Sequence, residues 1–140
     1  MKQSSIRLAS ALASIALVFS SLVFASFTAV VVASPASAAV LGDDYPSNLK
    51  NAALDSIVDP WRFYNRECTS FVAWRLNNAN GVAFSDFYLG PQWGNAKNWG
   101  AAARSVGISV NTTPVVGSVA WSDSGDYGHV AWVSEVSGSS

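Results

Sequence analysis

Hydrophobic residues are distributed differently in the first part of the chain and in the rest. From about residue 8 to residue 32 they form a long run, interrupted mainly by small polar residues. The run follows a basic head and ends in Ala36-Ser37-Ala38. A basic start, an apolar middle and a small-residue exit are typical of a cleaved export signal. We therefore predict a secretory signal peptide over residues 1–38 and a mature chain over residues 39–140.

The same run is also long enough to span a bilayer, so a membrane anchor is the alternative interpretation. The serine and threonine residues along the run, together with its small-residue exit, favour cleavage. No second apolar run of this length follows residue 38. We therefore expect an extracellular protein that has no membrane contact after the signal is removed.

The next part of the chain has the spacing of amphipathic helices. Before Pro60, four apolar residues recur at helical spacing: Leu49, Ala52, Ala53 and Ile57. A second helix is predicted to begin at Cys68, and its buried face is formed by Phe71, Val72 and Leu76. Gly81 suits the end of this helix. A third helix is predicted after Trp93 and ends near Gly107, with a core face formed by Ala96, Trp99, Ala102 and Ala103.

From Ile108 onwards the pattern changes to alternation, which is typical of strands. Ile108–Val110 predicts a short strand, and two longer strands are predicted over Ser118–Ser122 and His129–Val136. The polar residues 123–128 between the longer strands predict a hairpin. Helices followed by an antiparallel sheet define an α+β fold.

Composition and charge narrow the possible functions. The chain has 140 residues, 12% of them charged and half of them hydrophobic, which is enough for one domain. Removing Lys2 and Arg7 with the signal changes the formal charge from −1 to −3, because the basic count falls from 8 to 6 against 9 acidic residues. Basic clustering is absent from the sequence, so we do not expect nucleic-acid binding. We expect a monomer.

Cys68 and His129 are the only cysteine and the only histidine in the chain. A thiol at a helix start faces unpaired N–H groups and a partial positive charge, which favour the nucleophilic thiolate. A histidine on a later strand would complete a cysteine–histidine pair for nucleophilic catalysis. The alternative is structural, since a lone cysteine is often a small buried residue and a lone histidine is often a core or surface residue.

Four segments together resemble the CHAP family, the cysteine, histidine-dependent amidohydrolases/peptidases. They are Tyr64–Asn77, Trp93–Trp99, Pro114–Ala120 and Gly128–Val133, and the resemblance covers roughly residues 43–140. The related NlpC/P60 peptidases usually have Asp before the cysteine and Ser-Gly after it, whereas this chain has Glu67 before and Thr69-Ser70 after. The resemblance implies a papain-like fold, hydrolysis of amide bonds in cell-wall peptidoglycan, and a cell-wall-associated location. Cys68 would attack the carbonyl, and His129 would protonate the leaving amine.

Further residues have predicted roles in this chemistry. The backbone N–H of Cys68 would be one oxyanion donor, with Asn65 or Tyr64 as the second. Trp93 is predicted to form a groove wall, whereas Trp99 is predicted to fill the core. Asn95 is either an N-cap or a polar residue of the groove. No cofactor is expected, and no calcium site either: Asp59 matches a ligand of some CHAP domains, but Trp61 and Phe63 stand where oxygen ligands would be needed.

A catalytic histidine needs a partner for its other ring nitrogen. Glu135 would share a strand face with His129, but strand geometry places the two roughly 20 Å apart. Asp123 and Asp126 would reach His129 only through an unusual turn. In families of this kind the third residue comes from the following strand, which is expected beyond Ser140, so the chain is interpreted as a fragment or a defective copy that lacks C-terminal strands. The alternatives to hydrolysis are a non-catalytic cell-wall-binding or structural module and acyl transfer by the same thiol.

Overall fold

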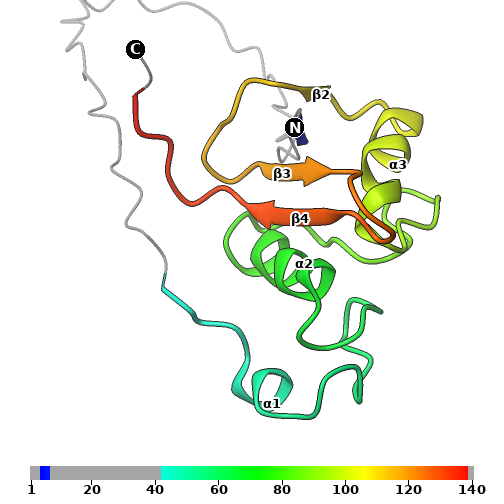
Figure 1. Ribbon diagram of the computed structural model, residues 1–140, viewed down its shortest axis with the longest axis vertical. Helices are drawn as coiled ribbons and strands as arrows, with labels where there is room; N and C mark the ends of the chain where they lie inside the picture. Colours follow the sequence, from blue (N-terminus) through cyan, green and yellow to red (C-terminus); the bar gives the residue numbers. More distant parts are fainter. Residues whose placement is uncertain (1–3, 7–41, 139–140) are drawn as a thin grey trace, which may run out of the picture.

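The computed structural model describes residues 4–6 and 42–138, and these residues form the predicted α+β fold (Figure 1). The helices are α1 (Ser47–Lys50), α2 (Cys68–Asn78), the short 3₁₀ helix η1 (Ala96–Asn98) and α3 (Trp99–Ser105). The strands are β1 (Ser4–Ile6), β2 (Val110–Asn111), β3 (Val119–Ser122) and β4 (His129–Trp132). None of the described helices is long and apolar enough to cross a membrane. The apolar run over residues 8–32 lies outside the described residues.

The four described strands form one antiparallel sheet in the order β2-β1-β3-β4. The predicted hairpin is present as β3 and β4, with Ser122 opposite His129 and Val119 opposite Trp132. β4 is shorter than the predicted His129–Val136, although Val133 continues the pairing by accepting from Gly117 N–H and donating to Ser118. Among the described strands, β4 pairs only with β3, so it lies at one edge of the described sheet.

A segment of the predicted signal peptide supplies the strand between β2 and β3. Ile6 lies opposite both Val110 and Val119, and its side chain is fully buried in the core. The sequence analysis predicted no strand here. Cleavage after Ala38 would therefore break the covalent link between β1 and the other described elements.

The helices and loops bury a cluster of aromatic rings. Figure 1 shows α2 beside β4 and α3 at the end of the sheet. Phe84 contacts Trp93 and Trp99, which are both fully buried, and Phe63 stacks on Phe84. The prediction that Trp99 fills the core is confirmed. At Gly100, a Cβ would lie 2.5 Å from the Trp121 ring, so only glycine lets α3 approach β3 this closely.

The helix predicted around residues 49–57 is mostly replaced by turns. α1 ends at Lys50, and only Leu49 of the predicted apolar face is fully buried. Asp55 has φ +56°, in the left-handed region that interrupts a helix. The polar contacts of this segment, described below, hold the turns that replace the helix.

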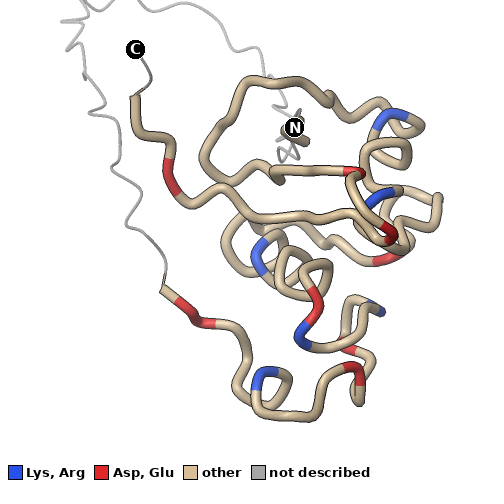
Figure 2. Tube along the Cα trace, viewed as in Figure 1, with Lys and Arg blue, Asp and Glu red and all other residues tan. Residues whose placement is uncertain are grey.

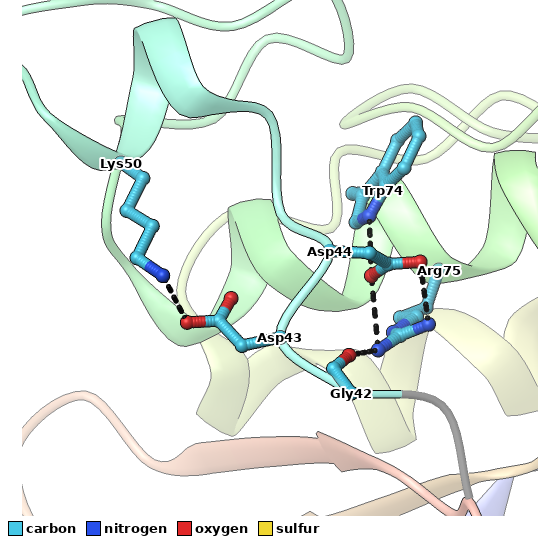
Figure 3. A network of polar contacts seen from close by, with 6 residues as sticks. All are labelled: Gly42, Asp43, Asp44, Lys50, Trp74 and Arg75. Carbon is cyan, nitrogen blue, oxygen red and sulfur yellow. Dashed lines mark hydrogen bonds and ion pairs between the residues drawn. The ribbon is translucent and has the colours of Figure 1, made fainter.

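The segment before α1 is tied to α2 by the buried Arg75 (Figure 3). The guanidinium donates to the Asp44 carboxylate and to the Gly42 carbonyl, and it lies over the rings of Phe71 and Trp132. Trp74 Nε1 also donates to Asp44, and Lys50 pairs with Asp43. A single side chain of α2 thus connects residues 42–44 to β4.

Candidate functional site

Cys68 is the first residue of α2, as predicted, and Glu67 occupies the N-cap position with extended backbone. The Cys68 side chain is half-buried and is a free thiol. An interaction with the backbone of Val130, in β4, lowers the pKa of the Cys68 thiol. β4 carries His129 at its first position. The packing of α2 against β4 therefore brings the segments of the two predicted catalytic residues together.

A buried polar network fixes the beginning of α2. Asp59 accepts hydrogen bonds from the backbone N–H groups of Trp61 and Phe63, both at 2.9 Å, and from the Ser70 hydroxyl. Ser70 is fully buried and also contacts the Tyr45 hydroxyl at 2.6 Å. Both carboxylate oxygens of Asp59 thus bind protein donors. Asp59 connects the preceding loop to the first turn of the nucleophile helix.

Asn65 belongs to the same structural network, so its predicted role as an oxyanion donor is wrong. Its side chain is fully buried. The amide nitrogen donates to the carbonyls of Leu49 and Ala53, and the amide oxygen accepts from Ile57 N–H. These bonds use the polar groups of the amide inside the fold. They stabilise the turns after α1 instead of facing a substrate.

Trp93 was predicted to form a groove wall, and this prediction is also wrong. Its ring is fully buried against Phe84 and Trp99, and its Nε1 donates to the Tyr88 carbonyl. Such a large ring is stabilised most by complete burial, and Phe84 and Tyr88 of the preceding loop pack against it.

Two cavities meet at Cys68. The first, here called the loop cavity, has a volume of about 580 Å³ and lies among loop residues that include Asp55, Tyr64, Asp86, Gln92 and Asn95. The second, the strand cavity, has a volume of about 1060 Å³ and lies along residues 128–132, with Phe71, Lys50 and Arg66 opposite. Glu67, Cys68, Tyr127 and Gly128 line both cavities. Cys68 is thus accessible from both cavities.

Tyr64 and Asn95 both line the loop cavity and are exposed. Asn95 also occupies the N-cap position of η1, but its side chain makes no capping hydrogen bond. Of its two predicted alternatives, the polar cavity residue agrees with this geometry. A role for either side chain in the reaction stays a prediction.

His129 lines the strand cavity together with Cys68, and its side chain is exposed. Within residues 4–6 and 42–138, no hydrogen bond to its imidazole is formed. Glu135 lies beyond the end of β4, where the chain continues away from the β3–β4 loop (Figure 1). Asp123 and Asp126 lie in that loop and are exposed. None of these carboxylates orients the imidazole in the described residues.

Burial raises the pKa of the Cys68 thiol above its ordinary value. The backbone N–H groups of Val130, Thr69 and Cys68 itself lower this pKa, whereas the negative charge of Glu67 raises it. Together these effects raise the pKa of the thiol, so the expectation that the helix start favours the thiolate is not met. The thiol is therefore protonated at neutral pH, and its deprotonation would need a base.

Asp55 and Glu67 are lining residues that the sequence analysis did not propose. Burial raises the pKa of Glu67, and Asp55 raises it further through its charge and a hydrogen bond between the two carboxyls. Glu67 was detectable in principle, because it precedes the cysteine. Asp55 was not, because it reaches the cavity only through the turn in which its N–H donates to the Asn65 carbonyl.

Charged residues of the described chain lie mainly around the start of α2 and in the loops (Figure 2). The strands β1–β4 carry no Lys, Arg, Asp or Glu. The described residues contain no group of three or more His, Cys, Asp or Glu side chains that could hold a metal ion.

Comparison with known proteins agrees with this arrangement. The CHAP domain profile matches residues 58–140, which include both Cys68 and His129. The staphylococcal secretory antigen SsaA of Staphylococcus aureus is 52% identical over 48 residues, or 34% of this chain and 19% of the relative. The staphylococcal secretory antigen ssaA2 is 48% identical over 48 residues, or 34% of this chain and 18% of the relative. The chain thus spans about a fifth of the length of these relatives, and no solved structure matches it significantly.

A cysteine at a helix start, beside a histidine strand in an α+β domain, is the arrangement expected of a thiol hydrolase. The family match covers more than half of the chain, so the chain belongs to the CHAP domain family. This family suggests peptidoglycan hydrolysis, and the relatives are named as secretory proteins.

Proposed function

We propose that the chain is an exported thiol amidase or endopeptidase that hydrolyses amide bonds of peptidoglycan, with Cys68 as nucleophile and His129 as base and acid. The observation that carries this proposal is that both residues line one cavity. The Val130 backbone lowers the pKa of the Cys68 thiol, and it would stabilise the thiolate as the imidazole removes the proton.

The reaction would have two steps. The Cys68 sulfur attacks the amide carbonyl while His129 takes the thiol proton, and the C–N bond breaks as that proton passes to the leaving amine. Water then attacks the thioester, again with His129 as base, and releases the carboxylic acid and the free thiol. The backbone N–H of Cys68, at the N-terminus of α2, would be one oxyanion donor. This chemistry uses no metal or organic cofactor.

A second candidate function is a module that binds the cell wall without cleaving it. Two observations favour it: the raised pKa of the Cys68 thiol, and the lack of an orienting partner for His129 in the described residues. The same cavities would then hold the wall polymer without reacting with it.

The test is incubation of purified cell walls with the full chain and with Cys68→Ala, followed by measurement of new amino groups in solution. We expect release by the full chain and none by Cys68→Ala, while both sediment with the walls. Sedimentation without release by either protein would favour the binding module. Export is tested by the N-terminal sequence of secreted material, which should begin at Ala39.

A further inference from the structure

β1 lies in the interior of the described sheet, although its neighbours there are far from it in the sequence. All three residues of β1 pair with β3, and Ser5 and Ile6 also pair with β2. β2 pairs with no other described strand, so β1 is its only connection to the sheet. The described sheet is therefore continuous only while a strand occupies the position of β1.

The backbone and the side chains of β1 both fit this position. A strand between two antiparallel neighbours pairs its N–H and C=O groups on both edges. The Ile6 side chain is fully buried and lies opposite Val110 and Val119, and Ser5, whose side chain points to the other face, is also buried. The position therefore suits an extended segment that has a β-branched side chain at one residue and a small side chain at the residue before it.

Charge limits the segment further. The four described strands contain no Lys, Arg, Asp or Glu. A charged side chain at the place of Ile6 would be removed from water without a partner of opposite charge, which is costly. The segment that fits between β2 and β3 is therefore an uncharged strand.

β1 is joined to the other described elements only through residues 7–41. The predicted cleavage after Ala38 falls within this connection. Covalent attachment holds a segment near its site at an effective concentration that can reach about millimolar, and cleavage removes this advantage. Three residues with one large buried side chain should bind weakly as a free peptide, because a single such side chain and a few backbone hydrogen bonds contribute little net free energy.

We propose that the space between Val110–Asn111 of β2 and Val119–Trp121 of β3, here called the strand slot, is a binding site for an extended peptide. Residues 4–6 of this chain occupy it until the export signal is removed, and they then dissociate. This inference goes beyond the proposed hydrolysis, because it involves neither Cys68 nor His129. It rests on the predicted removal of residues 1–38.

An open strand slot has two consequences. β2 and β3 each present an edge of unpaired backbone groups, and such edges accept an added strand. β3 also pairs with β4, so a peptide in the slot stabilises the strand that begins at His129. Removal of the signal thus exchanges a covalently attached strand for a site that binds one from solution.

The first experiment cuts the folded protein in place. A recognition sequence for a site-specific protease is inserted between Ala38 and Ala39 of the full chain. Hydrogen exchange at residues 110–111 and 119–122 is compared before and after cutting. After gel filtration at micromolar concentration, we expect loss of the fragment that contains β1 and exchange at least about tenfold faster at these residues. A fragment that stays bound, with unchanged exchange, would overturn the proposal that β1 dissociates.

The second experiment refills the slot with a labelled synthetic peptide of residues 2–8. We expect this peptide to bind the cut chain and not the uncut chain, whose slot is occupied. A peptide with Ile6→Asp should bind at least about tenfold more weakly, and one with Ile6→Val should bind within about twofold of the parent peptide. If the cut chain unfolds when β1 leaves, added peptide should restore its thermal transition. Equal binding to cut and uncut chains, or neither binding nor recovery, would overturn the proposal.

Substitutions in the uncut full chain provide an independent test. Ile6→Asp and Ser5→Pro should open the slot, because the first buries a charge and the second removes a ladder hydrogen bond. Both variants should exchange faster at β2 and β3 and should bind the peptide. Val136→Asp is the matched control, since Val136 is 45% exposed and lies outside the sheet, and it should do neither.

Two further measurements separate the possible outcomes. A concentration-dependent dimer of the uncut parent chain would show that β1 enters the slot of a second copy, and it would overturn the assignment to the same chain. All of these measurements can be repeated with Cys68→Ala, and the results should be unchanged. A chain that hydrolyses nothing but binds the peptide only after cutting would support the strand slot and contradict the proposed function.

Discussion

The two halves of the proposed catalytic site are held in very different ways. On the cysteine side, Asp59, Ser70 and Asn65 are buried and form hydrogen bonds that fix the loop and the first turn of α2. On the histidine side, His129 is exposed, and its position comes from the pairing of β4 with β3. The cysteine side is therefore held by buried side-chain hydrogen bonds, whereas the imidazole of His129 forms no hydrogen bond within the described residues. Substitutions of the buried polar residues on the cysteine side should therefore lower the stability of the fold. Substitution of His129 should instead lower the rate of hydrolysis.

The largest effect on stability is expected at Asp59. Asp59→Ala would leave the N–H groups of Trp61 and Phe63 and the Ser70 hydroxyl without their acceptor. Several buried donors left unpaired should lower the free energy of unfolding by about 4 kcal/mol, measured by urea denaturation. Asp123→Ala, at an exposed position near the histidine, is the control and should change stability by less than about 0.5 kcal/mol. Equal losses at the two positions would contradict the difference between the halves.

A smaller loss is expected at Ile6, which supports the histidine side from within the sheet. Its side chain is fully buried opposite Val119, and β3 in turn pairs with β4. Ile6→Ala in the full chain should cost about 2–3 kcal/mol, because it opens a cavity in the core. Leu54→Ala, at a side chain that is 55% exposed, is the matched control. If thermal unfolding of the full chain does not respond to Ile6→Ala, β1 contributes nothing to the sheet.

The smallest effect concerns the charge beside the thiol. The carboxylate of Glu67 raises the pKa of Cys68, so Glu67→Gln should lower that pKa and increase the thiolate fraction at a given pH. We expect iodoacetamide to alkylate Cys68 about two to five times faster in Glu67→Gln at pH 8. In the parent chain the rate should be low at neutral pH and should rise as pH increases past 9, because burial raises the thiol pKa above its ordinary value. A slower reaction in Glu67→Gln would reverse the sign of this interaction.

Local patterns were sufficient to predict the main elements. Helical spacing placed the start of α2 at Cys68, and alternation around a polar loop predicted the β3–β4 hairpin with His129 on its second strand. These features depend on neighbours in the sequence. The α+β fold class followed from them and is confirmed. The CHAP family, which was identified from the resemblance of four motifs, is also confirmed.

The features that sequence reasoning missed depend on contacts between distant segments. Asn65 and Trp93 were predicted to lie at a groove because one is polar, the other is aromatic and both are close to the motifs. The packing of the loops buries both side chains instead. The pKa of the Cys68 thiol is raised mainly by burial, and the position of Cys68 at the start of a helix does not predict that burial. β1 was missed because residues 1–38 have the composition of an export signal, and its pairing partners lie more than a hundred residues later.

The central claim is that Cys68 and His129 act as one catalytic unit, and a double-mutant cycle on amide hydrolysis tests it most directly. Cys68→Ala, His129→Ala and the double variant are compared with the full chain by the initial rate of amine release from purified cell walls. Residues that act in one proton-transfer step are strongly non-additive, so the double variant should be no slower than Cys68→Ala alone. His129→Ala alone should reduce the rate by a factor on the order of 10²–10⁴ without a change in melting temperature. Full activity of His129→Ala, or losses that multiply in the double variant, would contradict the account.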